Sequence, residues 1–154
     1  MKIDVRLAKK NDLAEIGKIF MEVFNKAVDK GWTEKTVNEY MHYWFKKKPE
    51  MFLVGEIGSK IVGGAMGAIR PMPKGNELID INVFVDIENQ NQGTGKKIFK
   101  ELIKKAVKDY NVTNIVGMAD KTANFPMNWY KRIGFSQCRW VQIEGKPIEL
   151  LKNL

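Results

Sequence analysis

The sequence predicts an α+β fold in which a mixed, mostly antiparallel sheet carries helices on both faces. Two strand-like stretches, residues 51–57 and 60–69, are separated only by Gly58-Ser59, as in a β-hairpin. Further along, residues 78–118 follow a strand, glycine turn, helix, strand order, which predicts one parallel connection. The 154 residues suit one domain spanning 1–154, and no linker or repeat interrupts them.

The first elements are a strand and an amphipathic helix. Residues 3–7 alternate apolar and polar side chains, as a half-buried strand does. Asp12 and Glu15 have the D-x-x-E spacing of a capping box, so we expect a helix to begin there. Apolar residues then recur every three or four positions to Val28, and Gly31 predicts the end of this helix.

A second helix and several strands follow. Thr33 predicts the start of this helix and Pro49 its end. After the hairpin, Pro71, Pro73 and Gly75 predict a break in the chain. The remaining predicted elements are a strand at 78–85, a helix at 96–110, a strand at 114–118, a helix at 127–132, and strands at 135–143 and 148–151.

Composition indicates a soluble globular protein, with 44% hydrophobic and 29% charged residues. No apolar run is long enough to cross a bilayer, and the N-terminus lacks the apolar core of a signal peptide. A single cysteine, Cys138, excludes an internal disulfide. We therefore expect a cytoplasmic protein that is not bound to a membrane.

The formal charge of +8 favours anionic partners. Most of the excess is lysine on predicted helix faces, which is typical of a solvated surface. A nucleic-acid surface would interleave exposed aromatic and basic residues, whereas the aromatic residues here recur at core-type spacings. Nucleic-acid binding is thus the weaker interpretation.

The run Gln90-Asn91-Gln92-Gly93-Thr94-Gly95 between a strand and a helix predicts a phosphate-binding turn. The first amides of a helix have no internal partner, and the helix dipole adds positive charge at that end. A P-loop does not fit, because no Ser or Thr follows the second glycine at Lys96-Lys97. A dinucleotide turn does not fit either, because Ile98 occupies its third glycine position. A purely structural tight turn stays open.

At these residues the chain resembles the GNAT N-acetyltransferases. Their shared motif, Arg/Gln-x-x-Gly-x-Gly/Ala, matches Gln90 to Gly95 at all three fixed positions. Tyr130, Gly134 and Phe135 match the family's Tyr-x-x-x-Gly-Phe, and the order of elements agrees from about residue 3 to 151. The sequence departs from the family in three places. Ile87 replaces a proline, and Ala123 replaces an asparagine, with Asn124 one position later. Pro126 lies in the helix before Tyr130, so we expect this helix to start near Met127.

The resemblance implies that acetyl-CoA binds as a co-substrate between two splayed strands. Its pantetheine amides would pair with backbone at Val83 and Val85, and a backbone N–H around Phe84–Val85 would stabilise the oxyanion. Its pyrophosphate would lie on the amides of Gln92 to Lys96, with Gln90 as a donor or a brace for the loop. The implied cofactor-binding residues are Val83, Phe84, Val85, Gln90, Asn91, Gln92, Gly93, Thr94, Gly95, Lys96 and Asn124.

The resemblance also implies a catalytic acid, Tyr130, that protonates the departing thiolate. The alternative is a core aromatic residue beside Trp129 and Phe135. Asp80, on the strand that would line the acceptor site, is the candidate base, because the amine must lose a proton. The alternative is that the carboxylate of Asp80 faces solvent and that a chain of water molecules serves as the base.

No metal is expected. His42 has no Cys, Asp or Glu around it at ligand spacing, and Cys138 has no neighbouring histidine that would make it a nucleophile. The resemblance places the acceptor over aromatic residues of the first two helices and their connection, which favours an apolar or aromatic-bearing acceptor. These residues are Trp32, Tyr40, Tyr43 and Trp44.

The function predicted from the resemblance is transfer of the acetyl group of acetyl-CoA to a primary amine by direct attack in a ternary complex. The acceptor implied by the resemblance is a small-molecule or peptide amine. Dimers are common in the family, so the resemblance also suggests a homodimer. The alternative is a non-catalytic acyl-CoA-binding or regulatory protein on the same fold, because a fold does not fix a function.

Overall fold

The structure is a computed structural model that describes residues 2–27, 31–120 and 124–153. The chain divides into two compact units, Met1–Met118 and Ala119–Leu154. The first unit contains the whole sheet, and each unit is described by itself below.

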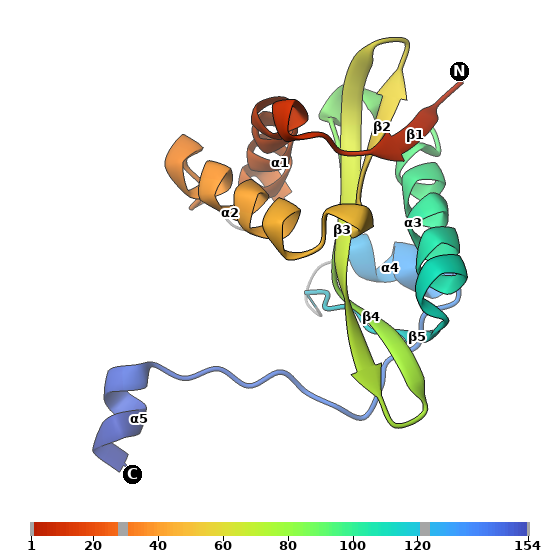
Figure 1. The fold of residues 1–154 in the computed structure, drawn as a ribbon. Helices are drawn as coiled ribbons and strands as arrows, with labels where there is room; N and C mark the ends of the chain where they lie inside the picture. Colours follow the sequence, from red (N-terminus) through yellow and green to blue (C-terminus); the bar gives the residue numbers. More distant parts are fainter. Residues whose placement is uncertain (1, 28–30, 121–123, 154) are drawn as a thin grey trace. The chain divides into compact units, whose positions relative to one another are not determined.

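Five strands form one sheet in the order in which they occur along the chain (Figure 1). They are β1 (Asp4–Leu7), β2 (Phe52–Ile57), β3 (Lys60–Met72), β4 (Gly75–Val85) and β5 (Val112–Ile115). Neighbouring strands are antiparallel except β4 and β5, which are parallel. Helices cover both faces of this sheet, which confirms the predicted α+β class.

Helices α1 (Leu13–Ala27) and α2 (Glu34–Lys47) cover one face of the sheet. Their apolar residues recur at helical spacing, so each helix buries one side, and Thr33 caps α2 by accepting from the N–H of Thr36. Each buried side chain stabilises the fold by about 1.5–3 kcal/mol. The buried residues include Leu13, Ile16, Phe20, Val37, Met41 and Trp44. The predicted end of the first helix at 28–30 lies outside the described residues.

Helix α3 (Thr94–Tyr110) covers the opposite face and buries Ile98, Phe99, Leu102 and Ala106. It packs closely on β2, since a Cβ built on Gly55 would lie 2.5 Å from Cδ1 of Ile98. Only glycine at position 55 leaves room for the helix at this distance.

The β2–β3 hairpin is confirmed, with Ile57 paired to Lys60 and Gly58 at φ +64°. The predicted break between these strands is confirmed as a turn at Pro73 and Lys74, but it begins later than Pro71, because β3 continues to Met72 and β4 begins at Gly75. The β2 ladder stops at Met66, so this end of β3 has a neighbour on one side only, and a proline is tolerated there.

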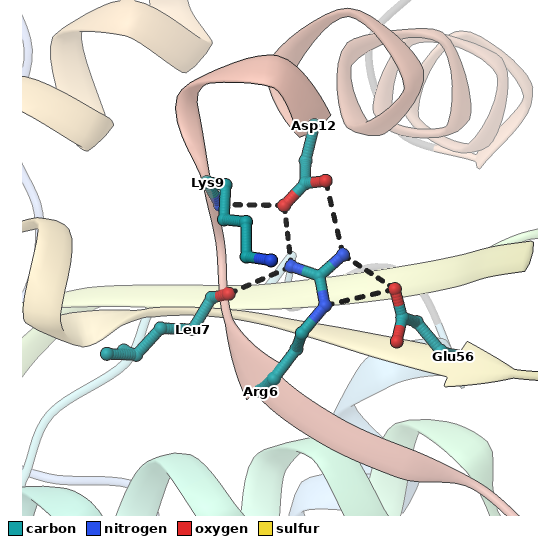
Figure 2. A network of polar contacts seen from close by, with 5 residues as sticks. All are labelled: Arg6, Leu7, Lys9, Asp12 and Glu56. Atoms are coloured by element: carbon teal, nitrogen blue, oxygen red, sulfur yellow. Dashed lines mark hydrogen bonds and ion pairs between the residues drawn. The ribbon is translucent and has the colours of Figure 1, made fainter. Parts of the chain in front are cut away.

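A guanidinium-centred network joins β1, β2 and the start of α1 (Figure 2). Arg6 donates to Asp12 at 2.6 and 3.1 Å, to Glu56 at 2.6 and 3.0 Å, and to the carbonyl of Leu7 at 3.0 Å. The carboxylate of Asp12 also accepts from the N–H of Lys9 at 2.7 Å. The predicted capping box is therefore wrong, because Asp12 is the third residue of a 3-10 turn and reaches back toward Lys9 and Arg6.

The last predicted strands need correction. β5 spans Val112–Ile115, not 114–118, because the chain pairs with β4 directly after the left-handed C-cap of α3 at Asn111. Among the described residues, 135–143 and 148–151 form no strand, and Pro147–Asn153 form helix α5 with its proline at the first position. A strand needs a ladder partner, and these residues have none in the second unit.

Helix α4 (Asn124–Arg132) begins three residues earlier than predicted. Pro126 is its third residue, where the missing N–H has no helical acceptor anyway. No described helix is long and apolar enough to cross a membrane.

Candidate functional site

A β-bulge interrupts β4 at the point where the candidate site begins. The register with β3 shifts between Ile79, which faces Ala68, and Asn82, which faces Met66. Asp80 lies in this bulge at φ +52°, a conformation that non-glycine residues seldom adopt. The bulge adds one residue to β4. Beyond it, the backbone groups that would have faced β3 therefore face the opposite edge, and the groups between them face β3.

Beyond the bulge, β4 has an open edge on the side of β5. The parallel ladder ends where Leu78 faces Ile115, and the N–H of Val116 donates to the carbonyl of Leu78 at 2.9 Å. On the other side, the N–H of Asp86 donates to Val62 in β3. Since backbone groups alternate along a strand, those of Val83 and Val85 point to the open edge.

A brace from the turn confirms this direction. Nε2 of Gln90 donates to the carbonyl of Val85 at 2.9 Å, so this carbonyl lies on the side of the turn. Of the two roles that the sequence left open for Gln90, this hydrogen bond corresponds to holding the loop.

The turn itself is built by two left-handed residues, Asn91 at φ +59° and Gly93 at φ +84°. Gly93 is the N-cap of α3, and the first internal helical bond runs from the N–H of Lys97 to the carbonyl of Gly93. The preceding amides of Thr94, Gly95 and Lys96 therefore have no acceptor within the helix.

Electrostatics and space at the turn both suit an anion. The first turn of α3 contains no acidic residue and carries Lys96 and Lys97. A Cβ added to Gly93 would meet no protein atom within 4 Å, so the space beside it is open. Thr94 is buried, and its hydroxyl has no hydrogen-bond partner among the described residues. Gly95 lies against Val85, with a built Cβ 3.4 Å from its Cγ2.

The predicted acceptor wall is a continuous series of aromatic contacts on the α1–α2 side. Trp32 packs on Tyr40, Tyr40 on Trp44, and Trp44 on Tyr43, with ring centroids 4.9 to 6.1 Å apart. Trp44 belongs to the core, whereas Tyr43 is 53% exposed. Burial raises the pKa of the Tyr40 hydroxyl.

The candidate base, Asp80, is exposed, and its carboxylate lies 3.9 Å from Nζ of Lys47 in α2. Lys47 was not among the predicted site residues, since in the sequence it is one of three consecutive lysines at 46–48. Only the register of β4 against α2 brings this lysine and the carboxylate together.

Tyr130 and Asn124 belong to the second unit, in α4. The N–H of Phe135 donates to the carbonyl of Tyr130 and that of Gly134, at φ +106°, donates to Lys131. These two bonds make a Schellman motif, which ends the helix, and the ring contact of Tyr130 with Phe135 at 5.2 Å accompanies it. The Tyr-x-x-x-Gly-Phe spacing therefore has a structural cause.

The side chain of Tyr130 is mostly buried, and burial raises its pKa. A tyrosine keeps its proton at neutral pH even at its ordinary pKa of 10.0, and burial strengthens this preference.

Two further reactive residues are His42 in α2 and Cys138 in the second unit. His42 contacts the carbonyl of Asn38 on its own helix at 2.9 Å, and Cys138 is exposed. In the part of the chain that the structure describes, no group of three potential metal ligands occurs.

The acetyltransferase (GNAT) family model matches residues 13–135 of this chain. A comparison with curated proteins finds no match. Among solved structures, a "possible acetyltransferase" from Clostridium difficile 630 is similar, with 19% identity, 95% of this chain and 98% of that chain covered, and a TM-score of 0.81.

Two further structures share the fold. A ribosomal-protein-alanine N-acetyltransferase from Brucella melitensis biovar Abortus 2308 is 15% identical, with coverage of 94% and 99% and a TM-score of 0.73. A predicted acetyltransferase with acetyl-CoA from Clostridium acetobutylicum is 16% identical, with coverage of 93% and 96% and a TM-score of 0.70.

Proposed function

Because the chain belongs to the GNAT acetyltransferase family, we propose that it transfers the acetyl group of acetyl-CoA to a primary amine within a ternary complex. The observation that carries this proposal is the open edge of β4 directly beside the N-terminus of α3. A solved structure of the same fold contains acetyl-CoA, which supports the choice of donor.

The β4 edge and the turn suit two parts of the donor. Pantetheine carries amides spaced along a thin chain, and these would pair with the backbone of Val83 and Val85 as an added strand does. The pyrophosphate would then lie on the amides between Gln92 and Lys96, where the helix dipole favours negative charge. Asn91 shapes this turn through its left-handed backbone.

In the proposed reaction, the amine nitrogen attacks the thioester carbonyl carbon and forms a C–N bond. The carbonyl oxygen becomes an oxyanion, which the N–H of Val85, on the open edge beside Phe84, would stabilise. The C–S bond then breaks, the amide is formed, and the sulfur leaves as a thiolate.

Two protons complete the balance. Asp80 accepts the proton that the amine loses, directly or through water, and Tyr130 gives its proton to the thiolate. A tyrosine carries its proton at neutral pH, so Tyr130 is protonated before the thiolate appears. Asn124, at the start of the same helix, is proposed as a further contact to the cofactor.

The test is release of the CoA thiol from acetyl-CoA in the presence of a panel of primary amines. We expect amine-dependent release, and Tyr130→Phe should lower kcat by about 10²- to 10⁴-fold, the usual effect of a general acid. The phenylalanine ring keeps the contact with Phe135, so α4 should still end normally.

CoA affinity is the control, because Tyr130→Phe should leave it nearly unchanged. Tight binding of CoA without thiol release from any amine would reject the transferase and favour a non-catalytic CoA-binding protein.

A further inference from the structure

We propose that Tyr43, Trp44 and Asp80 form a binding site for the alkylammonium group of the acceptor, and that Lys47 fills this site as an internal competitor. The acceptor class is then an unbranched primary alkylamine, either a free amine or the side chain of a lysine in a peptide. The proposal deepens the proposed function and rests on it for the reaction itself.

Four groups converge on the ammonium of Lys47. Its Nζ lies 5.3 Å from the ring centroid of Tyr43 and 4.9 Å from that of Trp44. It also donates to the hydroxyl of Tyr43 at 3.1 Å and lies 3.9 Å from Oδ2 of Asp80. The ring face of Trp44, the hydroxyl edge of Tyr43 and the carboxylate of Asp80 are groups that a protein uses to bind an ammonium ion.

Each part of this cage is held in place by the fold. The Trp44 side chain is buried in the core and cannot turn away. Asp80 owes its direction to the bulge, and Nδ2 of Asn82 donates to the carbonyl of Asp80 at 3.2 Å within the same bulge. A left-handed non-glycine residue costs about 1–3 kcal/mol, and such strain tends to persist where function requires it.

The position of the cage fits the acceptor side of the reaction. Asp80 lies on β4, the strand whose open edge begins just beyond the bulge at Val83. Asp80 precedes Val83 by three residues, so the cage and the open edge belong to the same stretch of β4. The carboxylate that binds the arriving ammonium is also the proposed acceptor of its proton.

The present occupant indicates which ligand fits. Lys47 carries its charge on four methylene groups, so the cage accommodates a slim, unbranched alkylammonium. Lys47 is the last residue of α2 and its side chain is 37% exposed, which leaves it free to swing into solvent. An acceptor with the same head group would displace it at little cost, because surface ion pairs contribute only about 0–1 kcal/mol.

The test replaces the internal competitor. Lys47→Met keeps a linear side chain but removes the charge, and we expect KM for butylamine to fall about fivefold, as when a competing state worth about 1 kcal/mol is removed. The control is Lys46→Met, which removes the same charge from the neighbouring exposed position. Nα-acetyl-lysine amide, assayed in parallel, distinguishes a free alkylamine from a lysine side chain by its kcat/KM.

A binding measurement keeps this inference separate from catalysis. Butylammonium chloride, titrated without acetyl-CoA, should shift the indole N–H resonance of Trp44, with half-saturation at a lower concentration in Lys47→Met than in Lys46→Met. Asp80→Asn, which tolerates the left-handed backbone, should weaken this binding several-fold.

The outcomes separate the two proposals. Amine-dependent turnover with the same KM in Lys47→Met and Lys46→Met would overturn the cage and leave the transferase standing. A saturable Trp44 shift with no turnover would retain the cage and reject the transferase.

Discussion

At the scale of single residues, Arg6 joins three elements that are distant in sequence. It binds Asp12 through two nitrogen atoms and shares Glu56, so one guanidinium connects β1, β2 and the beginning of α1. Hydrogen bonds from Arg6, with that from the N–H of Lys9, hold the pKa of the Asp12 carboxyl below its usual value. The carboxyl group therefore stabilises the folded state in its charged form.

This coupling predicts how Asp12→Asn depends on pH. At pH 7 the variant should lose about 1–3 kcal/mol of unfolding free energy, because Arg6 loses a charged partner. The contribution of Asp12 is complete above its ordinary pKa of 3.8 and disappears as pH falls through the lower value of the folded state. Urea unfolding should thus show a smaller difference between variant and wild type at pH 2.5 than at pH 7.

Asp109→Asn provides the control for this prediction. Asp109 pairs with Lys105 on the exposed surface of α3, where solvent screens the interaction. Equal losses in the two variants at pH 7 would contradict a special role for the Arg6 network.

At the scale of elements, the turn at the start of α3 depends on glycine at position 93. Gly93 and Gly58 both adopt positive φ, and a Cβ added to either would meet no protein atom within 4 Å. The two glycines therefore differ only in the ligand that each could contact.

We expect Gly93→Ala and Gly58→Ala to cost similar stability, about 1–2 kcal/mol each, because alanine is strained in the left-handed region. Only Gly93→Ala should weaken CoA binding, by about tenfold or more, since its methyl group would project into the space proposed for the pyrophosphate. Calorimetric titration with CoA measures the affinity, and thermal unfolding measures the strain. A similar affinity in both variants would remove the turn from the CoA site.

Much of this architecture was predictable because it depends on local patterns. The Thr33 cap, the Gly58 hairpin and the helix after Gly93 all follow from neighbouring residues. The two C-terminal strands were mispredicted, because short apolar runs such as Trp140–Ile143 suit a strand only when a ladder partner exists.

The candidate site also has a part that local sequence patterns predict and a part that they do not. The turn and its amides were identified from the glycine spacing, which is a local signal. The bulge at Asp80 results from the register of β4 with β3, and the contact with Lys47 results from the packing of α2, whose residues lie more than thirty positions earlier in the sequence. No periodicity in the sequence predicts such contacts.

At the scale of the whole molecule, the formal charge of +8 should attract a cofactor that carries several phosphate charges. We expect the dissociation constant of CoA to rise several-fold between 50 and 500 mM NaCl, because salt screens this attraction. Dephospho-CoA, which carries less negative charge, should show a weaker dependence. A salt-independent affinity for CoA would contradict an electrostatic contribution.

The same experiment separates two uses of the positive charge. If the lysine-rich surface is only solvated, a single-stranded oligonucleotide should not displace CoA at 150 mM NaCl. Displacement would revive the nucleic-acid interpretation.

The bulge in β4 also determines which mutations the site can survive. Substitutions at Val83 and Val85 change the side chains but retain the backbone groups that face the open edge. Deleting one residue at Asp80 would restore a regular ladder and turn those groups toward β3, while the groups of Phe84 would turn outward. The proposed cofactor edge is therefore sensitive to insertions and deletions at the bulge, because the single extra residue there determines which backbone groups face outward.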